Sequence, residues 1–179
     1  MINVSEVMKT PPLTFKTPLH EKVYKTLEAL KIPFERVDTD EAVTMEDCEN
    51  INKRLDMDMV KTLFLCNRQQ TMFYLFVTAG NKPFVTSEFS KKLGVSRISF
   101  APVDLFEKML GTKIGAATVF SALIDEDRDL QIVIDADVAN SEWYGCSDGT
   151  NTGYMKVSTK KIIEEFLPYT KHKAKIIEL

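Results

Sequence analysis

A single lysine in an otherwise apolar run is the first residue with the means to do chemistry. Lys61 lies near the start of residues 60–65, where every other residue except Thr62 is hydrophobic. A buried, unpaired ammonium is costly, so this side chain must either reach the edge of the strand or meet an anion. The pattern leaves both interpretations open, a lysine that reaches solvent and a lysine that binds a ligand.

Two stretches rich in small residues could bring the backbone close to a ligand. The first covers residues 110–118 and the second covers residues 145–153. Glycine allows tight turns and close approach of the backbone, although glycines also end helices and serve ordinary turns. We predict that these two loops and Lys61 enclose one pocket.

The reactive residue types are too few and too scattered for a conventional catalytic centre. The cysteines are Cys48, Cys66 and Cys146, and the histidines are His20 and His172, one near each end. Spacings of this kind form neither a CxxC site nor a disulfide framework, which favours a reducing compartment and a cytoplasmic protein. Motifs such as GxGxxG, HExxH and the P-loop are absent. We therefore expect no metal and no cofactor.

Other acidic and aromatic residues have simpler interpretations. Asp135 and Asp137 follow an apolar segment within an acid-rich part of the chain, and we expect them in a solvated loop. Phe100 and Phe120 are expected in the core. Cys66 ends an apolar run and is expected to be a small core residue.

Composition indicates an ordinary globular chain. The 179 residues are 44% hydrophobic and 27% charged, and the formal net charge is -3. This length suits one domain with a sizeable core. The charge argues against a protein that coats DNA or RNA by bulk positive charge, although it permits a local basic patch. We therefore expect no DNA partner. Since no apolar run approaches the roughly 20 residues of a membrane-spanning helix, we also expect no membrane partner.

The elements that must position these residues alternate without a regular βαβ repeat. Residues 1–16 predict an irregular lead-in, and residues 17–179 predict a single domain. Helices are expected from Pro18 to about residue 31, from Thr44 to about Leu55, and over residues 88–93, 103–110 and 158–167. Strands are expected over residues 34–37, 60–66, 72–78, 97–101, 130–134, 155–157 and 175–177. The fold class is therefore α+β, with one mixed, mostly antiparallel sheet surrounded by helices.

Taken in order, these blocks resemble the YbaK/ProX family of aminoacyl-tRNA editing domains, also called prolyl-tRNA-synthetase-associated domains, in a free-standing form. Residues 59–65 resemble the lysine-bearing strand of that family, and residues 97–101 with the following helix resemble its next block. Residues 111–120 match its glycine turn, and residues 149–158 match its closing block. The resemblance covers about residues 18–170 and rests on the order of the blocks.

This resemblance implies a trans-acting deacylase of mischarged tRNA, typically tRNA for proline that carries alanine or cysteine. It implies the acceptor end of tRNA as partner and prolyl-tRNA synthetase as a further candidate partner. In such sites water attacks with help from the tRNA ribose and backbone N–H groups, and a small pocket excludes the larger cognate residue. The sequence leaves one alternative open, a non-catalytic module of the same fold that senses aminoacyl-tRNA or a free amino acid.

The resemblance also selects the site residues. The predicted catalytic set is Lys61, Gly111 and Gly115, where the lysine contacts substrate and the glycines shape the amino-acid pocket. The predicted substrate-binding residues are Thr62, Thr118, Ser147, Asp148 and Asn151. Ile114 departs from the family pattern, which has proline at this position. Ser147 and Asp148 stand where many members carry a histidine-proline pair.

Overall fold

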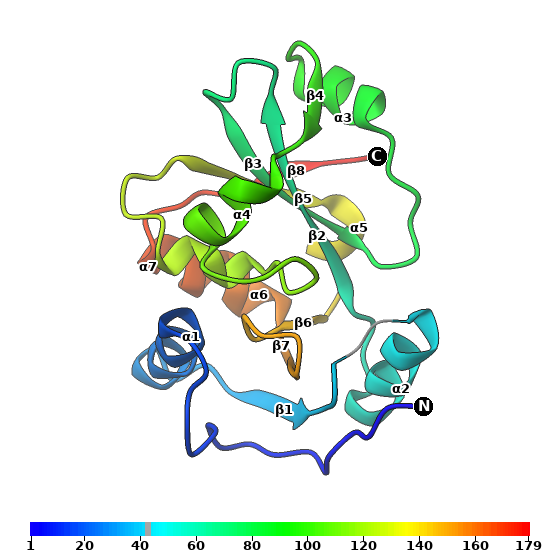
Figure 1. The fold of residues 1–179 in the computed structure, drawn as a ribbon, viewed down its shortest axis with the longest axis vertical. Helices are drawn as coiled ribbons and strands as arrows, with labels where there is room; N and C mark the ends of the chain where they lie inside the picture. The colour runs from blue at the N-terminus through cyan, green and yellow to red at the C-terminus, as the bar shows by residue number, and fades with distance from the viewer. Residues whose placement is uncertain (42–43) are drawn as a thin grey trace.

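The computed structural model describes residues 1–41 and 44–179, and its strands form two sheets. The large sheet has the strand order β4-β2-β3-β5-β8, and the small sheet has the order β1-β7-β6 (Figure 1). The strands are β1 (Phe34–Asp38), β2 (Val60–Asn67), β3 (Phe73–Ala79), β4 (Ile98–Phe100), β5 (Leu130–Asp135), β6 (Trp143–Ser147), β7 (Gly153–Ser158) and β8 (Lys175–Ile177). The α+β class is confirmed, but the strands divide between two sheets where the sequence predicted one.

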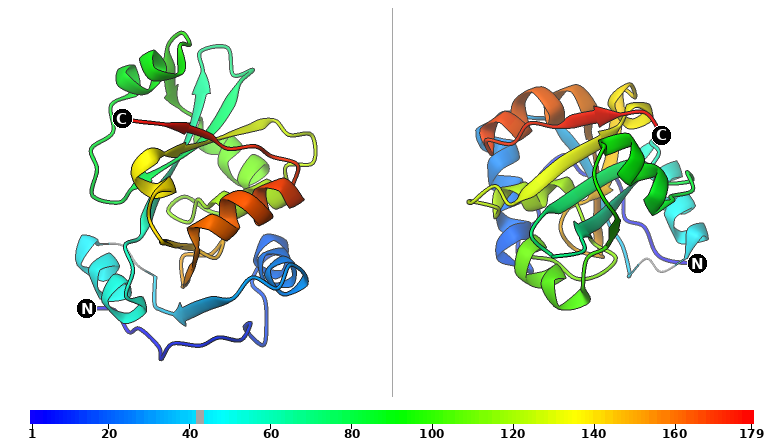
Figure 2. Two further views of the ribbon diagram at one scale, coloured as in Figure 1. Left: turned by 180° about the vertical axis from the view of Figure 1, so that it is seen from behind. Right: turned by 90° about the horizontal axis from the view of Figure 1, so that it is seen from above.

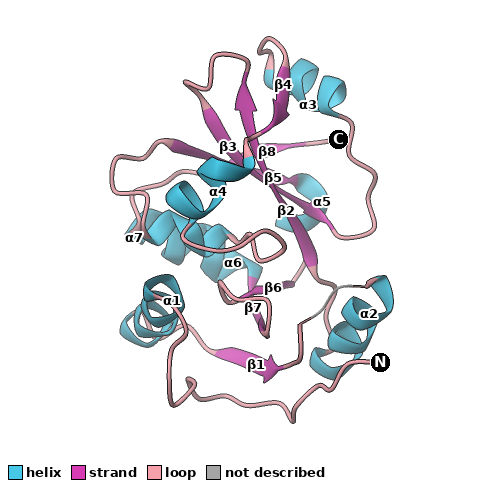
Figure 3. Ribbon diagram, viewed as in Figure 1, coloured by secondary structure: helices cyan, strands magenta, loops and turns pink. Residues whose placement is uncertain are grey.

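Helical segments surround both sheets (Figure 3). They are α1 (Pro18–Ala29), α2 (Met45–Leu55), α3 (Thr86–Leu93), α4 (Val103–Leu110), the 3₁₀ helix η1 (Val119–Leu123), α5 (Ala136–Ala139), α6 (Thr159–Lys161), the π-helical η2 (Ile162–Phe166) and α7 (Leu167–Tyr169). Capping chemistry sets several ends as predicted. The Thr17 hydroxyl caps α1, Thr44 and Asp47 form a capping box on α2, and Gly111 ends α4. The α3 helix begins at Thr86 after an N-cap at Val85, two residues earlier than predicted.

The β2–β3 hairpin forms the centre of the large sheet. Val60 pairs with Ala79 and Cys66 pairs with Phe73 in an antiparallel register, as the two adjacent apolar runs predicted. β5 then joins β3 in parallel, and β8 joins β5 in parallel at the edge (Figure 2). Because three strands add to the hairpin, both hairpin strands are interior to the sheet.

Alternate residues of the large sheet enter two separate cores. Phe64 and Leu75 point into the larger core, which also receives side chains from α1, η1 and η2. Leu65 and Phe76 point to the opposite face and pack with Phe89 of α3. Burial on both faces explains why these strands read as nearly continuous apolar runs in the sequence.

Three sequence predictions are wrong in detail. Residues 145–147, predicted as loop, belong to β6 because they pair with β7. Asp135 is 1% exposed and caps α5, so it is no part of a solvated loop. Phe100 is 59% exposed because it ends the short β4 at the sheet edge, whereas Phe120 and Cys66 are buried as predicted.

Both chain ends are tied to the folded body. Residues 1–16 run along the free edge of β1, where Met8 and Arg36 exchange two backbone hydrogen bonds of 2.8 and 2.9 Å. Near the other end, the His172 Nε2 atom lies 2.7 Å from Asp125 Oδ2, and both side chains are buried. This pair fastens the turn before β8 to the loop before β5. In the described part of the chain, no helix is long and apolar enough to cross a membrane.

Candidate functional site

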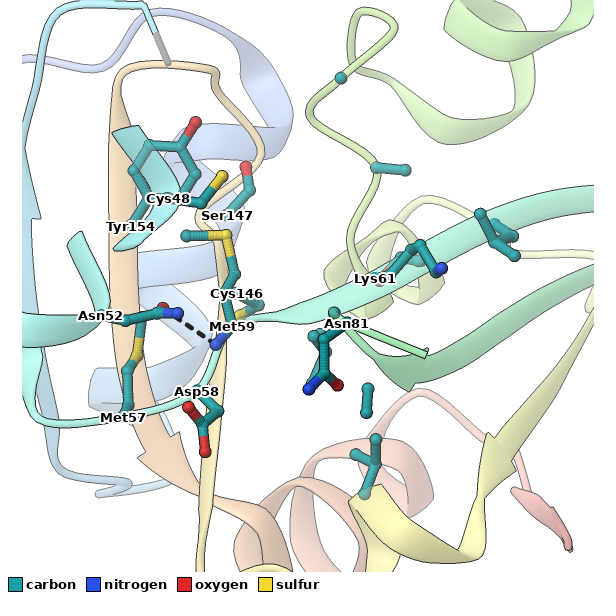
Figure 4. Close-up of a pocket in the computed structure, with 18 of the residues that line it drawn as sticks. Cys48, Asn52, Met57, Asp58, Met59, Lys61, Asn81, Cys146, Ser147 and Tyr154 are labelled. Atoms are coloured by element: carbon teal, nitrogen blue, oxygen red, sulfur yellow. Dashed lines mark hydrogen bonds between the residues drawn. The ribbon is translucent and has the colours of Figure 1, made fainter. Parts of the chain in front are cut away.

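A cavity of about 1270 Å³ lies where the two sheets meet. Its walls come from β2, α2, β6, the start of α4 and the loop after α4. Residues 57–59 cross between the sheets at this place, and Met59 forms a parallel bridge with Gly145. Figure 4 shows Cys48, Ser147 and Tyr154 on one side of the cavity and Lys61 on the other.

The structure places part of each small-residue loop and the lysine-bearing strand on this one cavity. The predicted site residues that line it are Lys61, Thr62, Gly115 and Ser147. The predicted residues outside its lining are Gly111, Thr118, Asp148 and Asn151. These two groups differ in kind, because the first faces open space and the second holds the loops in shape.

Lys61 has no carboxylate partner among the residues that the structure describes. Its ammonium is half-buried and donates to the backbone carbonyl of Lys82. The nearby carboxylates of Asp135 and Asp137 are instead bound by Lys82 Nζ, at 2.8 and 3.0 Å. A carbonyl oxygen carries no full charge, so the positive charge of Lys61 is not neutralised and remains available at the cavity wall.

The loop after α4 presents a tight turn to the cavity. The Ala116 N–H donates to the Lys113 carbonyl at 3.0 Å, and Gly115 has a φ of 92°. Ile114 has a negative φ, since it is absent from the left-handed residues. This combination is a type II turn, in which the third position favours glycine and the second favours proline. Ile114 occupies that second position, and its side chain is 60% exposed at the rim of the cavity.

Gly111 and Thr118 lie at the two ends of this loop, where Gly111 ends α4 and Thr118 precedes η1. Gly111 has a φ of 68°, and a Cβ there would lie 2.5 Å from Ile124 Cδ1. The Thr118 hydroxyl is fully buried and caps η1 by accepting from the Phe120 N–H. Both residues therefore fix the two ends of the loop and do not face the cavity.

Asp148 is a buried acceptor at the centre of the second loop. Its Oδ2 accepts from the Tyr24 hydroxyl at 2.7 Å and lies 3.0 Å from His20 Nε2. Its Oδ1 accepts from the Thr150 hydroxyl at 2.7 Å. Burial opposes ionisation, but the hydrogen bonds from these three partners hold the pKa of Asp148 below its ordinary value. The Asp148 carboxylate thus links α1 to the second loop through buried hydrogen bonds.

Two neighbours of Asp148 show how closely the second loop is built. The Lys16 N–H donates to His20 Nδ1 at 3.0 Å, so the ring proton is on Nε2 and is donated to Asp148. Gly153 approaches the same carboxylate so closely that a Cβ would lie 2.2 Å from Oδ2. Only glycine fits at this position.

The two loops are joined to each other by a buried hydrogen bond. The Thr112 hydroxyl donates to the Gly149 carbonyl at 2.7 Å. Ser147, on the cavity side, donates to the Thr150 carbonyl at 2.6 Å and accepts from the Gly149 N–H at 3.1 Å. Asn151 lies farther out, where its amide donates to Glu41 at 3.2 Å. The loop geometry near the cavity is therefore set by hydroxyls and backbone groups together with the Asp148 carboxylate.

The thiols at the cavity are not activated nucleophiles. Burial raises the pKa of the Cys146 thiol well above its ordinary value, and burial also raises the pKa of Cys48. A thiol acts as a nucleophile in its ionised form, which these environments disfavour. Within residues 1–41 and 44–179, no group of three or more His, Cys, Asp or Glu residues could hold a metal ion. The cavity offers the ammonium groups of Lys53 and Lys61, hydroxyls and backbone N–H groups, together with the carboxylates of Glu49, Asp56, Asp58, Asp137 and Glu142.

Several cavity residues escaped the sequence analysis. Phe100 was assigned to the core, and the wall formed by Cys48 and Asn52 of α2 was not anticipated. The Asn52 side chain accepts from the Met59 N–H at 3.0 Å and so fixes the crossing between the sheets (Figure 4).

Asp135, which was assigned to a solvated loop, could have been recognised from the sequence as a helix cap. A polar residue directly after an apolar strand often caps a following helix.

Known proteins were compared with the chain in sequence and in structure. The sequence profile of the aminoacyl-tRNA editing domain matches residues 39–164. The prolyl-tRNA editing protein ProX of Acetoanaerobium sticklandii is 26% identical over 159 residues, covering 89% of this chain and 96% of that protein. The crystal structure of a candidate trans-editing enzyme for prolyl-tRNA synthetase matches with a TM-score of 0.64 and 15% identity, over 92% of this chain and 99% of the other. The hypothetical protein APE2540 matches with a TM-score of 0.64 and 14% identity, over 87% and 98%.

Proposed function

The chain belongs to the aminoacyl-tRNA editing domain family, and from this premise we propose that it removes alanine or cysteine from mischarged tRNA for proline. As a member of that family it is a hydrolase of the aminoacyl-tRNA ester bond that acts in trans. The narrower substrate is supported by the likeness to a prolyl-tRNA editing protein along nearly the whole chain. The proposed partners are the aminoacylated acceptor end of tRNA and prolyl-tRNA synthetase, whose errors the protein would correct.

The unneutralised ammonium of Lys61 on the cavity wall is the observation that carries this proposal. The 3′ end of tRNA is anionic, and its ester carbonyl gains negative charge during hydrolysis. A lysine without a carboxylate partner attracts both groups, and a charge-assisted contact of this kind is among the stronger hydrogen bonds in proteins. Thr62, Gly115 and Ser147 share the cavity and complete the proposed contact surface.

The proposed reaction is attack by water on the ester carbonyl. Cys48 and Cys146 are the thiols at the cavity, and burial holds both in the protonated form. Oriented backbone N–H groups near the Gly115 turn would stabilise the oxyanion, and the rim at Ile114 would limit the size of the amino acid that enters. We assign positioning roles to Gly111, Thr118, Asp148 and Asn151, because each belongs to one of the two loops and none lines the cavity.

The decisive experiment measures deacylation of a small panel of charged tRNAs. Alanyl-, cysteinyl- and prolyl-tRNA for proline are incubated with micromolar protein, and the remaining ester is counted over time. We expect the alanyl or cysteinyl ester to be lost faster than the prolyl ester. Hydrolysis of none of them, by a folded protein, would contradict the proposal.

Lys61 supplies the matching test within the chain. Lys61→Ala should lower kcat/KM about tenfold to a hundredfold, the effect of losing one charge-assisted contact. Lys91→Ala on α3 is the matched control, since this exposed lysine does not line the cavity. Full turnover by a folded Lys61→Ala protein would remove Lys61 from the site.

A further inference from the structure

Lys61 stands in a row of polar side chains that crosses three strands of the large sheet. It pairs directly with Thr78 on β3, and the Thr78 hydroxyl donates to Asp135 Oδ2 of β5 at 2.7 Å. Neighbouring strands lie about 4.8 Å apart, so Asp135 is two strand spacings from Lys61 on the same side of the sheet. A lysine side chain could span that distance and form an ion pair with Asp135.

In the structure the carboxylates of Asp135 and Asp137 are occupied by Lys82. Its ammonium binds Asp135 and Asp137 at the same time, at 2.8 and 3.0 Å. Its backbone carbonyl accepts the hydrogen bond from Lys61 Nζ. One residue thus occupies the nearby carboxylates with its side chain and holds the Lys61 ammonium with its main chain.

Electrostatics reinforces this division. Asp135 is 1% exposed, and although burial opposes its ionisation, the hydrogen bonds from Lys82 and Thr78 hold its pKa below the ordinary value. The hydrogen bond that Lys82 donates to Asp135 likewise raises the pKa of Lys82. The buried carboxylate is therefore ionised and strongly held, and it would bind any other cation within reach if Lys82 lost its charge.

We infer that Lys82 and Asp135 are positioning residues for Lys61: by pairing with each other they leave the Lys61 ammonium with a neutral partner and direct its charge to the cavity. The inference rests on the proposed role of Lys61 in binding the aminoacyl-tRNA end. It predicts that removing the Lys82 ammonium disables Lys61 without changing Lys61 itself. A purely structural role for Lys82, as a fastener of the turn at residues 80–83, predicts lower stability and an unchanged site.

A double-mutant cycle separates these two roles. Lys82→Met should lower kcat/KM about as much as Lys61→Ala, that is about tenfold to a hundredfold. Adding Lys61→Ala to Lys82→Met should cause no further loss, because both act on the same charge. Lys82→Arg, which keeps a cation for the two aspartates, should restore most of the activity. Independent, multiplying losses in the double variant would overturn the inference.

A second pair of variants covers the case in which Lys82→Met does not fold. Lys82→Met with Asp135→Asn leaves no unpaired buried carboxylate. The Asp137 carboxylate remains, but its side chain is 67% exposed, so it competes only weakly for Lys61. Its kcat/KM should lie within about threefold of the native value, less than the loss expected for one charged contact. A folded Lys82→Met, Asp135→Asn protein with the low kcat/KM of Lys61→Ala would overturn the inference.

A labelling experiment works without any enzymatic activity. Each folded protein is treated briefly with acetic anhydride, and modification of Lys61 is followed by mass spectrometry. Lys61 should react several-fold more slowly in Lys82→Met than in the native protein, because a paired carboxylate favours the protonated ammonium and leaves less of the unprotonated amine that attacks the anhydride. An unchanged rate would overturn the positioning role. If no charged tRNA is hydrolysed but Lys61 labelling slows, the proposed function fails and the positioning of Lys61 stands.

Discussion

Two histidines, one near each end of the chain, contact buried aspartates through Nε2, yet the two pairs hold different numbers of protons. His20 donates to Asp148, while its Nδ1 accepts a backbone N–H. His172 lies against Asp125, while its Nδ1 faces the carbonyl and hydroxyl oxygens of Thr170, each at 2.9 Å. A neutral imidazole satisfies both hydrogen bonds of His20. His172 satisfies both of its hydrogen bonds only if each ring nitrogen carries a proton.

The backbone around each ring makes this difference. The Thr170 hydroxyl already donates to the Leu167 carbonyl at 2.8 Å, so it can only accept from His172. The pair beside the cavity therefore contains one charge, on Asp148, which is surrounded by neutral donors. The pair near the C-terminus has the arrangement of an ion pair, with oxygen acceptors at both ring nitrogens of His172. Residue types alone do not distinguish the two.

The largest difference in free energy of unfolding between the two histidine–aspartate pairs is expected when the aspartate of each pair, Asp148 or Asp125, is replaced. Asp148→Ala leaves the donors of His20, Tyr24 and Thr150 buried without their acceptor and should lower the free energy of unfolding by about 3–5 kcal/mol. Asp125→Ala should cost about 1–3 kcal/mol, because fewer side chains depend on it. Urea unfolding of both variants measures these losses. Equal losses would mean that the Asp148 network is no stronger than the Asp125 pair.

Exchanging each histidine for glutamine should sharpen the comparison. Glutamine keeps an N–H donor for the aspartate but carries no charge. His172→Gln should therefore lower the free energy of unfolding by about 1.5–3 kcal/mol, as expected for loss of a charged hydrogen bond. His20→Gln should cost about 1 kcal/mol, since that ring is already neutral. Thermal unfolding at pH 6 compares the variants, and the reverse order would contradict the proton assignments.

Acid should weaken both regions. Burial opposes ionisation of Asp125, but hydrogen bonds from His172 and two backbone N–H groups keep its pKa below the ordinary value, as similar bonds do for Asp148. When the folded pKa is the lower one, the unfolded chain takes up protons first as the pH falls. Their stabilisation is then complete above about pH 4, near the unfolded pKa, and is lost as the pH falls through the folded values.

The measurement follows the free energy of unfolding in urea between pH 5 and pH 2.5, at constant ionic strength. The native protein should lose stability across this range more steeply than Asp125→Asn, which has one fewer titrating group. Parallel pH profiles for the two proteins would show that Asp125 contributes no pH-dependent stability.

The smallest expected change concerns the turn joined to the Asp148 loop through Thr112. Ile114→Pro should raise the free energy of unfolding by about 0.4–1 kcal/mol, because proline fits the second position of a type II turn and restricts the unfolded chain. We also expect faster single-turnover hydrolysis of alanyl-tRNA, since Ile114 departs from the proline of the family pattern. A well-folded proline variant that is slower than the native protein would identify Ile114 as an adapted part of the pocket.

Local signals in the sequence predicted elements well and the cavity only in part. Thr17 and the Thr44–Asp47 pair cap helices where predicted, because capping depends on residues within one turn. The strand that contains Lys61 was predicted from a local signal too, the apolar run of residues 60–65. In the described part of the chain Lys61 has no carboxylate partner, and its neighbours Lys82 and Asp135 come from other elements that only tertiary folding brings near it.

Phe100 and the strand at residues 143–147 show the limit of such reasoning. Hydrophobicity assigned Phe100 to the core, but a residue at the end of a short edge strand is buried only if another element covers it. The glycine of residues 143–147 suggested a loop. In the structure Gly145 leaves space for the crossing chain, since a Cβ there would lie 2.4 Å from Met57 Sδ. Both outcomes are decided by contacts between distant segments.

The lead-in at residues 1–16 covers the outer edge of the small sheet. β1 is the outer strand of the small sheet, and its free side is occupied by backbone hydrogen bonds from Met8 and Ser5. Without this cover β1 would present unpaired N–H and C=O groups to solvent, the usual template for strand addition between molecules. A chain that lacks residues 1–16 should therefore associate through the exposed edge of β1. This association should occur under conditions in which the fold around the cavity is still intact.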